Sequence, residues 1–268
     1  MFDMKVVDYF ALDKKRGEIG VEIEAEFEHP CAAVVPSPWR VDLDGSLRGF
    51  AYEFVLKNPV SRGTINSALN KLEDCLSDHK ILHSIRAGIH IHLNVQDLTI
   101  KQVLNFMMCY YLLETALLRT CGENREGNLF CLRNSDAAST TLALERVIEG
   151  ADFHIAHSNS YRYSALNFQS LFRYGSLEFR SLATEPDLAN IRPWIDVLLT
   201  LKDASLKVQN PLDLVMDISG DGASYWAQKM LGKHFERMDY PDMEKDIMKN
   251  LRMIQVALYS LQEATQGG

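Results

Sequence analysis

Ionisable side chains recur at every second position in several short segments of this sequence. They are carboxylates, imidazoles and a guanidinium: Glu22 with Glu24, Glu53, His90 with His92, and Glu178 with Arg180. A β-strand projects residues i and i+2 from the same face, so each pair would stand on one side of a strand. If these strands lie side by side, the carboxylates converge and would repel one another unless a cation lies among them.

The composition of this cluster predicts a metal and nucleotide platform. Mg²⁺ is bound by oxygen ligands and is commonly shared with substrate phosphates, and an imidazole can join its ligand shell. The planar guanidinium of Arg180 is suited to holding a transferring phosphoryl group. Each pair alone is more typical of the solvent-facing side of an antiparallel sheet than of a functional site. The prediction therefore depends on the convergence of all the pairs.

The periodicity predicts an α+β fold with a mainly antiparallel sheet. Alternation is clearest over 17–28, where apolar residues alternate with glutamates. Thr99 and Gln102 form a capping box at the start of a long apolar helix. The strands lie at irregular distances, which disfavours a doubly wound parallel sheet. Strands are expected over 17–28, 50–57, 85–95, 161–169 and 175–182, and helices over 64–79, 99–117, 140–149, 187–206, 223–235 and 243–263.

Length and charge limit the organisation and the partners. We expect a single domain over 1–268, with a core over 17–205 and a C-terminal helical extension over 206–268 packed on it. The 28 basic and 36 acidic residues give a net charge of -8, the wrong sign for binding nucleic acid or an anionic membrane. The first ten residues resemble no signal peptide, and the five cysteines show no metal spacing, so we expect a cytoplasmic protein with reduced thiols. The helical last third could supply an oligomer interface.

Six short signatures in order resemble the motifs of the amidoligase family, which belongs with glutamine synthetase and glutamate-cysteine ligase. The similarity runs from about residue 17 to about residue 205. The signatures are Gly20-Val21-Glu22-Ile23-Glu24, Asp44-Gly45-Ser46-Leu47, Glu53, Gly88-Ile89-His90-Ile91-His92, Arg162-Tyr163 with Asn167, and Glu178-Phe179-Arg180.

The resemblance implies a curved, mainly antiparallel half-barrel flanked by helices, like the glutamine synthetase catalytic domain. It implies ATP and Mg²⁺, or Mn²⁺ in its place, and a carboxylate that is activated as an acyl phosphate and then attacked by an amine. Position by position, the ligands of the metal at the nucleotide phosphates would be Glu22, His90 and Glu178, and those of the metal nearer the acceptor would be Glu24 and Glu53. His92 and Arg180 would contact the ATP phosphates and, with Glu53, are the expected catalytic residues.

Four further residues are candidates for binding. Related ligases place an arginine where Arg125 lies, able to meet phosphate or a substrate carboxylate. Arg162 and Asn167 could bind nucleotide or the acid substrate, and Asp44 could position the donor. The segment after Glu53 is Phe54-Val55-Leu56-Lys57-Asn58-Pro59, which departs from the family's commoner Ser-Pro ending. The resemblance therefore does not extend to the substrate contact at this point.

Two other enzyme classes share these ingredients. A zinc hydrolase could use His90, His92 and a glutamate, but it would leave three carboxylates and Arg180 unexplained. A phosphotransferase acting on a guanidino group would need the same metal and nucleotide groups. The expected substrates are a small carboxylate and an amine, or the amine of a peptide or protein, and the sequence identifies neither of them.

Overall fold

A computed structural model describes residues 1–31, 34–43, 45–122, 125, 127–128, 131–133, 138–157 and 163–266. Within these residues, a mixed sheet-and-helix fold is built on one six-stranded sheet with the order β2-β3-β1-β4-β6-β5. All neighbouring strands are antiparallel. The predicted α+β class with an antiparallel sheet is therefore confirmed. The strands are β1 (Ile19–Phe27), β2 (Trp39–Asp42), β3 (Phe50–Leu56), β4 (Gly88–Asn94), β5 (Leu166–Asn167) and β6 (Ser176–Ala183).

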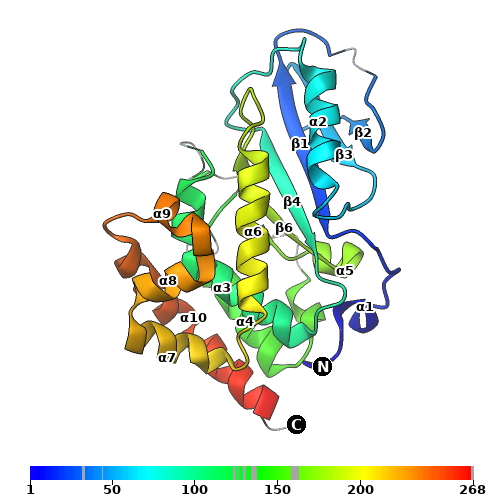
Figure 1. The fold of residues 1–268 in the computed structure, drawn as a ribbon. Helices are drawn as coiled ribbons and strands as arrows, with labels where there is room; N and C mark the ends of the chain where they lie inside the picture. The colour runs from blue at the N-terminus through cyan, green and yellow to red at the C-terminus, as the bar shows by residue number, and fades with distance from the viewer. Residues whose placement is uncertain are drawn as a thin grey trace.

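Helices lie over one face of the sheet and gather beside it toward the C-terminus. In Figure 1, α2 and α6 lie in front of the strands, and α7 to α10 form a group beside α3 and α4. The helices are α1 (Val6–Tyr9), α2 (Ile65–Leu76), α3 (Ile100–Arg119), α4 (Ala138–Glu149), α5 (Ser170–Tyr174), α6 (Ile191–Ser205), α7 (Pro211–Asp221), α8 (Ala223–Leu231), α9 (Phe235–Met238) and α10 (Met243–Gln266). Short 3₁₀ turns span Phe153–Ala156 and Gly232–His234.

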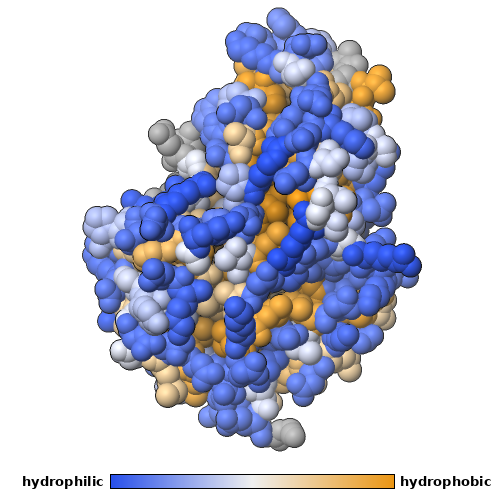
Figure 2. Space-filling model, in the orientation of Figure 1, coloured by the Kyte–Doolittle hydropathy of each residue, from blue (hydrophilic) through white to orange (hydrophobic). Residues whose placement is uncertain are grey.

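Strand β1 separates an apolar face from a charged face. Ile19, Val21, Ile23 and Ala25 are at most 1% exposed and belong to the hydrophobic core. The glutamates alternate with them and therefore point to the opposite side of the sheet. This alternation fixes which face of the sheet meets the helices and which face is left for chemistry. Figure 2 shows the helical side, where hydrophilic side chains cover most of the surface and apolar ones remain visible in a seam between helices.

Helix α3 is the centre of the helical layer. Its predicted capping box is present, with Gln102 N donating to Thr99 Oγ1 at 3.2 Å and Thr99 N donating to Gln102 Oε1 at 2.9 Å. Every side chain from Val103 to Leu118 is buried, as expected for a helix covered on all sides. Helix α10 packs against α3, and Asn250 Nδ2 donates to the carbonyl oxygens of Tyr111 and Leu112.

Some elements differ from the sequence expectations. The strand expected over 161–169 is the two-residue β5, with residues 161 and 162 outside the described part of the chain, and the short helix α5 connects it to β6. The helix expected over 223–235 ends at Leu231, because Gly232 adopts a positive φ of 52°. Strand β2 and helices α1 and α7 were not predicted, although Asn210, Pro211 and Asp213 form a recognisable start for α7.

Among the described residues, no helix is both long and apolar enough to cross a bilayer. The cytoplasmic location and the division into a core and an extension stay predictions.

An ion-pair network ties the sheet to α6 at the start of β1. Glu18 accepts hydrogen bonds from Arg62 Nε at 2.7 Å, Arg62 Nη2 at 2.9 Å and Lys202 Nζ at 2.6 Å. Arg62 also donates to both carboxylate oxygens of Asp203. The hydrogen bonds from Arg62 and Lys202 outweigh the effect of burial and lower the pKa of Glu18 to about 2.

We expect Glu18→Gln to lower the free energy of unfolding by about 1–2 kcal/mol at neutral pH, a value reduced for the solvent screening of Arg62. The pKa of Glu18 is lower in the folded state than in the unfolded chain. Its contribution is therefore fully present above the unfolded value of about 4.3 and is lost as the pH falls toward 2. Urea unfolding of wild type and variant over this pH range should show the two stabilities converging.

The matched control is Glu28→Gln, because Glu28 forms an exposed pair with Lys80 at 3.1 Å. That change should cost less than about 0.5 kcal/mol. A Glu18→Gln deficit that stays constant from neutral pH to pH 2 would show that the charge of Glu18 is not what stabilises the fold.

Candidate functional site

The strand register brings the charged residues of the sequence motifs onto one face of the sheet. Glu22 lies opposite His90 on β4, and Glu24 lies opposite Glu53 on β3. His92 lies opposite Glu178 on β6. Residues opposite each other in an antiparallel pair project from the same face. Three neighbouring strand pairs therefore build a single cluster, although its members are more than 150 residues apart in the chain.

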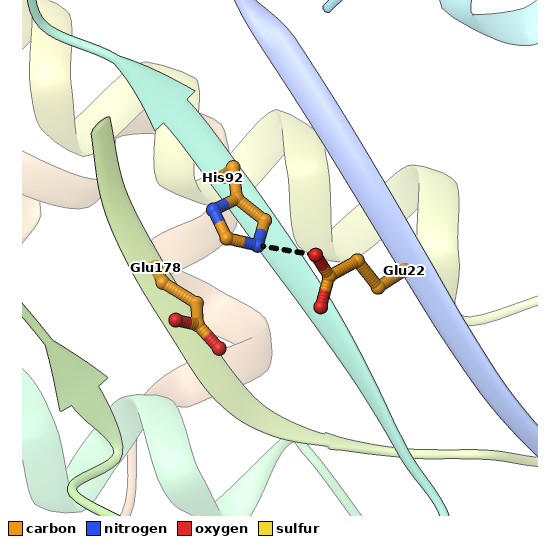
Figure 3. Close-up of side chains that lie close together, drawn as sticks. All are labelled: Glu22, His92 and Glu178. Carbon is orange, nitrogen blue, oxygen red and sulfur yellow. Dashed lines mark ion pairs between the residues drawn. The ribbon is translucent and has the colours of Figure 1, made fainter. Parts of the chain in front are cut away.

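The two imidazoles lie among the carboxylates. His90 Nδ1 is 3.2 Å from Glu22 Oε2 and 3.7 Å from Glu178 Oε1, and His90 Nε2 is 3.7 Å from Glu24 Oε1. His92 Nε2 is 3.3 Å from Glu22 Oε1. Figure 3 shows Glu22, His92 and Glu178 reaching from β1, β4 and β6 toward one common space. His90 thus bridges carboxylates of β1 and β6, and His92 pairs with Glu22 and lies within 4.8 Å of a Glu178 oxygen.

The cluster is sheltered from solvent, and this governs its ionisation. The side chains of His90, Glu24 and Glu178 are 4%, 8% and 8% exposed. Burial alone would raise the pKa of Glu22, but the two imidazoles hold this pKa well below its usual range. For Glu178, burial is outweighed by the charges of His92 and Arg180, and its pKa is also lowered. The pKa of His92 is raised, because the carboxylates of Glu22 and Glu178 outweigh its burial.

Glu178 is held by one residue on each of its oxygens. Arg180 Nη1 donates to Glu178 Oε1 at 2.5 Å, and Asn167 Nδ2 donates to Glu178 Oε2 at 2.7 Å. The attraction of Glu178 outweighs burial and raises the pKa of Arg180, which keeps the guanidinium charged. Asn167, expected from the sequence to bind substrate or nucleotide, thus contacts the carboxylate of a predicted metal ligand. Short β5 is the element that places this amide.

A bulge in β6 explains the position of Arg125. The pairing of β4 with β6 shifts register between Ile89 and Ile91, which leaves backbone carbonyls of β6 outside the ladder. Arg125 Nε donates to the carbonyl oxygen of Ser181 and Arg125 Nη2 donates to that of Arg180, both at 2.7 Å. Arg125 is 2% exposed. It therefore supplies hydrogen-bond donors to the carbonyl oxygens at the bulge. Its contact with phosphate or with a substrate carboxylate stays a prediction.

Gly20 and Gly88 leave room on the charged face. A Cβ at Gly88 would lie 3.0 Å from Arg125 Nη2 and 3.6 Å from both Glu24 Oε2 and His90 Nε2. The backbone N–H of Gly88 donates to Glu24 Oε2 at 2.9 Å and fixes that carboxylate. A Cβ at Gly20 would lie 3.2 Å from His92 Cβ. A side chain at either position would crowd the cluster.

The donor atoms fit a hard divalent cation. Two sets of three residues place ligand atoms within 4.8 Å of one another: Glu22, His92 and Glu178, and Glu22, Glu53 and His90. Carboxylate oxygens dominate both sets, as Mg²⁺ and Mn²⁺ prefer. The sequence-based assignment paired His90 rather than His92 with Glu22 and Glu178. Both imidazoles lie close enough to Glu22 to serve, so the geometry accommodates either assignment.

A pocket of about 510 Å³ adjoins one end of the cluster. Glu22 and His92 line it, and so do four cationic side chains that the sequence motifs did not reveal: Lys15, Arg40, Lys57 and Arg173. Arg40 pairs with Asp42 at 2.8 Å, and the Arg173 guanidinium lies 5.0 Å from the centre of the Tyr174 ring. The basic run Lys14-Lys15-Arg16 before β1 was the available sequence signal for this wall.

Comparison with known families agrees with this geometry. A family model described as "Putative amidoligase enzyme" matches residues 13–202, which is most of the chain. The chain belongs to the amidoligase family. The matched region contains all six strands of the described sheet and every member of the charged cluster. No match is found among the curated proteins.

Two candidate residues of this amidoligase lie outside the part of the chain that the structure describes. They are Asp44 and Arg162, and their predicted roles stay predictions. The other candidates fall into two groups. Glu22, Glu24, Glu53, His90, His92, Glu178, Arg180 and Asn167 form or contact the cluster, and Arg125 lies at its edge beside Gly88.

We expect Glu53→Gln to stabilise the amidoligase by about 0.5–1 kcal/mol in the presence of a chelator, because carboxylates directly opposite each other in a sheet are destabilising. Added Mg²⁺ should raise the free energy of unfolding of the wild type, since a ligand that binds only the folded state stabilises it. The increase should be smaller for the variant, because the variant lacks one of the metal-binding carboxylates. Urea unfolding with EDTA and with MgCl₂ measures both effects without any assay of activity.

Glu26→Gln is the matched control. Glu26 lies on the same face of β1 but opposite Ala51, and its Oε1 accepts a hydrogen bond from Arg48 N at 2.8 Å. Its response to Mg²⁺ should equal that of the wild type. Equal Mg²⁺ stabilisation of all three proteins would contradict a metal site at Glu53.

Proposed function

We propose that this amidoligase is an ATP- and Mg²⁺-dependent ligase that joins a carboxylate to an amine through an acyl-phosphate intermediate. The observation that carries the proposal is the convergence of Glu22, Glu24, Glu53 and Glu178 with two imidazoles and Arg180 on one sheet face. Four carboxylates this close call for cations, and a cationic pocket adjoins them on one side. Both features occur in a chain of the amidoligase family.

The chemistry explains why a ligase needs such a face. A free carboxylate is a poor acceptor for an amine, because the leaving group would be oxide. In the proposed first step a carboxylate oxygen attacks the γ-phosphorus of ATP, the bond to the β,γ-bridging oxygen breaks, and ADP leaves. In the second step the amine nitrogen attacks the acyl carbon, phosphate leaves with the C–O bonding electrons, and the nitrogen gives up a proton.

The side chains divide this work by position. Arg180, held by Glu178 and lying 3.5 Å from His90 Nδ1, would stabilise negative charge on the transferring phosphoryl group. His92 stands at the junction of the cluster and the pocket and would contact the phosphates. Glu24 and Glu53 lie on the side of the cluster away from the pocket-lining residues and would face the donor and amine. Divalent ions held by these carboxylates would neutralise their charge and polarise phosphoryl oxygens.

The pocket is the proposed nucleotide site. It combines apolar floor residues such as Val55 and Leu56 with cationic walls, and it opens directly onto Glu22 and His92. A triphosphate reaching from the pocket to these two residues would place its terminal phosphate beside Arg180. The antiparallel sheet with one charged face also supports the proposal that the fold is a glutamine synthetase-like half-barrel. The expected acceptor is a small amine or the amine of a peptide or protein.

Glu178→Gln should lower amine-dependent ADP formation by at least about 10³-fold, because it removes a carboxylate that orients Arg180 and completes a metal-ligand set. Coupled ADP and phosphate assays on pools of carboxylates and amines measure the rate, and mass spectrometry identifies the product. The exposed Glu263→Gln on α10 serves as the control and should retain the wild-type rate.

The product separates this proposal from a phosphotransferase. A ligase releases phosphate in an amount equal to the amide formed, whereas a guanidino phosphotransferase leaves phosphate on its product. ADP formation by Glu178→Gln at the wild-type rate would remove the proposed role of the cluster.

Arg180→Lys keeps the charge but removes the planar guanidinium, whose Nη1 contacts both Glu178 and His90. We expect kcat to fall by about 10²-fold with a smaller change in KM for ATP, since the interaction strengthens in the transition state. Steady-state kinetics with varied ATP at saturating carboxylate and amine measures kcat and the KM for ATP separately. An unchanged kcat would show that Arg180 does not stabilise the transferring group.

A further inference from the structure

Residues 11–17, here named the N-terminal strap, cross the end of the sheet and form one wall of the pocket. Ala11, Leu12, Asp13 and Lys15 of the strap line it. The strap has no regular secondary structure, and Ala11 holds a left-handed φ of 51°. A conformation of this kind persists where surrounding contacts impose it.

Two amide side chains at the end of β4 supply those contacts. Asn94 Nδ2 donates to the carbonyl oxygen of Gly17 at 2.7 Å. Gln96 Oε1 accepts from Lys15 N at 2.8 Å, and Gln96 Nε2 donates to the carbonyl oxygen of Asp13 at 3.1 Å. Backbone groups of an irregular segment need such partners, because no ladder supplies them. The strap is thus held by side chains rather than by pairing with a strand.

Gln96 also contacts a second part of the pocket lining. Its Nε2 donates to the carbonyl oxygen of Tyr174 at 3.0 Å, at the corner between α5 and β6. Gln96 is 1% exposed, and a Cβ at Gly175 would lie 2.4 Å from Gln96 Cγ, so the amide is packed tightly under this corner. One buried side chain therefore joins the strap, which carries Lys15, to the corner that carries Arg173 and Tyr174.

The walls that Gln96 joins carry positive charge. Lys15, Lys57 and Arg173 form no ion pair with any residue that the structure describes. The chain has a net charge of -8, so three such cations around one pocket stand out from the general surface. They complement an anionic ligand that also reaches Glu22 and His92 through bound cations.

We propose that Gln96 is a positioning residue of the nucleotide pocket and that the strap it holds presents Lys15 to the polyphosphate chain of the nucleotide. This inference rests on the proposed ATP dependence. Gln96 acts by preorganisation: two of its hydrogen bonds hold the strap and the third anchors the amide at Tyr174, so the nucleotide does not have to order the strap. The residues of the charged cluster lie on β1, β3, β4 and β6 rather than on the strap, and Gln96 therefore governs affinity for ATP rather than the rate of the bound complex.

The test measures ATP binding by calorimetry with Mg²⁺ and the split between KM and kcat. Gln96→Leu should raise the Kd and the KM for ATP by about tenfold and leave kcat at saturating ATP within about threefold. Asn250→Leu is the matched control for lost amide hydrogen bonds, because buried Asn250 also donates to two backbone carbonyls but lies on α10. Its Kd for ATP should stay within about twofold of the wild-type value.

Lys15→Gln keeps the proposal testable if Gln96→Leu does not fold, because Lys15 is exposed. It should weaken binding of ATP and of inorganic tripolyphosphate by about five- to tenfold and leave adenosine binding unchanged. Its neighbour is the matched control: Lys14 pairs with Asp97 at 2.8 Å and does not line the pocket, so Lys14→Gln should bind like the wild type.

Different results would overturn the proposed ligase function and the proposed role of the strap. A wild type that binds neither ATP nor tripolyphosphate would overturn the proposed function. A wild type that binds ATP, with Gln96→Leu and Lys15→Gln indistinguishable from their controls, would overturn the role of the strap and leave the ligase proposal standing. A fall in kcat with unchanged ATP affinity in Gln96→Leu would also overturn it.

Discussion

The register of β1 in the sheet places the carboxylate of Glu22 within 4.8 Å of those of Glu53 and Glu178. The rest of the structure has to balance the repulsion between these like charges. The apolar residues of β1 fix this register, because Ile19, Val21 and Ile23 are buried against the helices. A slip by one residue would send these side chains to the charged face and the glutamates into the core. Burial of these apolar side chains thus also holds the glutamates in place. The site is therefore as rigid as the sheet that carries it.

The balance of charge comes from groups carried by β4 and β6. His90 and His92 lie between carboxylates of different strands, and Arg180 takes one oxygen of Glu178 while Asn167 takes the other. These contacts lower the pKa values of Glu22 and Glu178, so both stay ionised despite their burial. Ionised, oriented carboxylates are the form that binds a hard cation. A structure that kept them protonated would be less suited to that chemistry.

The sequence revealed what depends on strand alternation and missed what depends on irregular backbone. Glu22 with Glu24 and His90 with His92 could be assigned to one face from their spacing alone, and the antiparallel register then brought them together. The contact between Asn167 and Glu178 required the two-residue β5, which is too short to leave a periodic pattern. The pocket escaped prediction for a similar reason. Lys15 and Arg173 are 158 positions apart, and the hydrogen bonds of Gln96 join the two segments that carry them.

The C-terminal helices support the site from a distance. The family match ends at residue 202, before α7 begins, yet α10 covers one side of α3, whose other contacts include the sheet. Tyr110 on α3 reaches β6, where its hydroxyl lies 3.3 Å from Ser181 Oγ, and the carbonyl of Ser181 accepts from Arg125 beside the cluster. Without α10, buried side chains of α3 would meet solvent, at a cost of roughly 25 cal/mol for each Å² of apolar surface. The extension therefore stabilises the helix on which the bulged strand and its arginine rest.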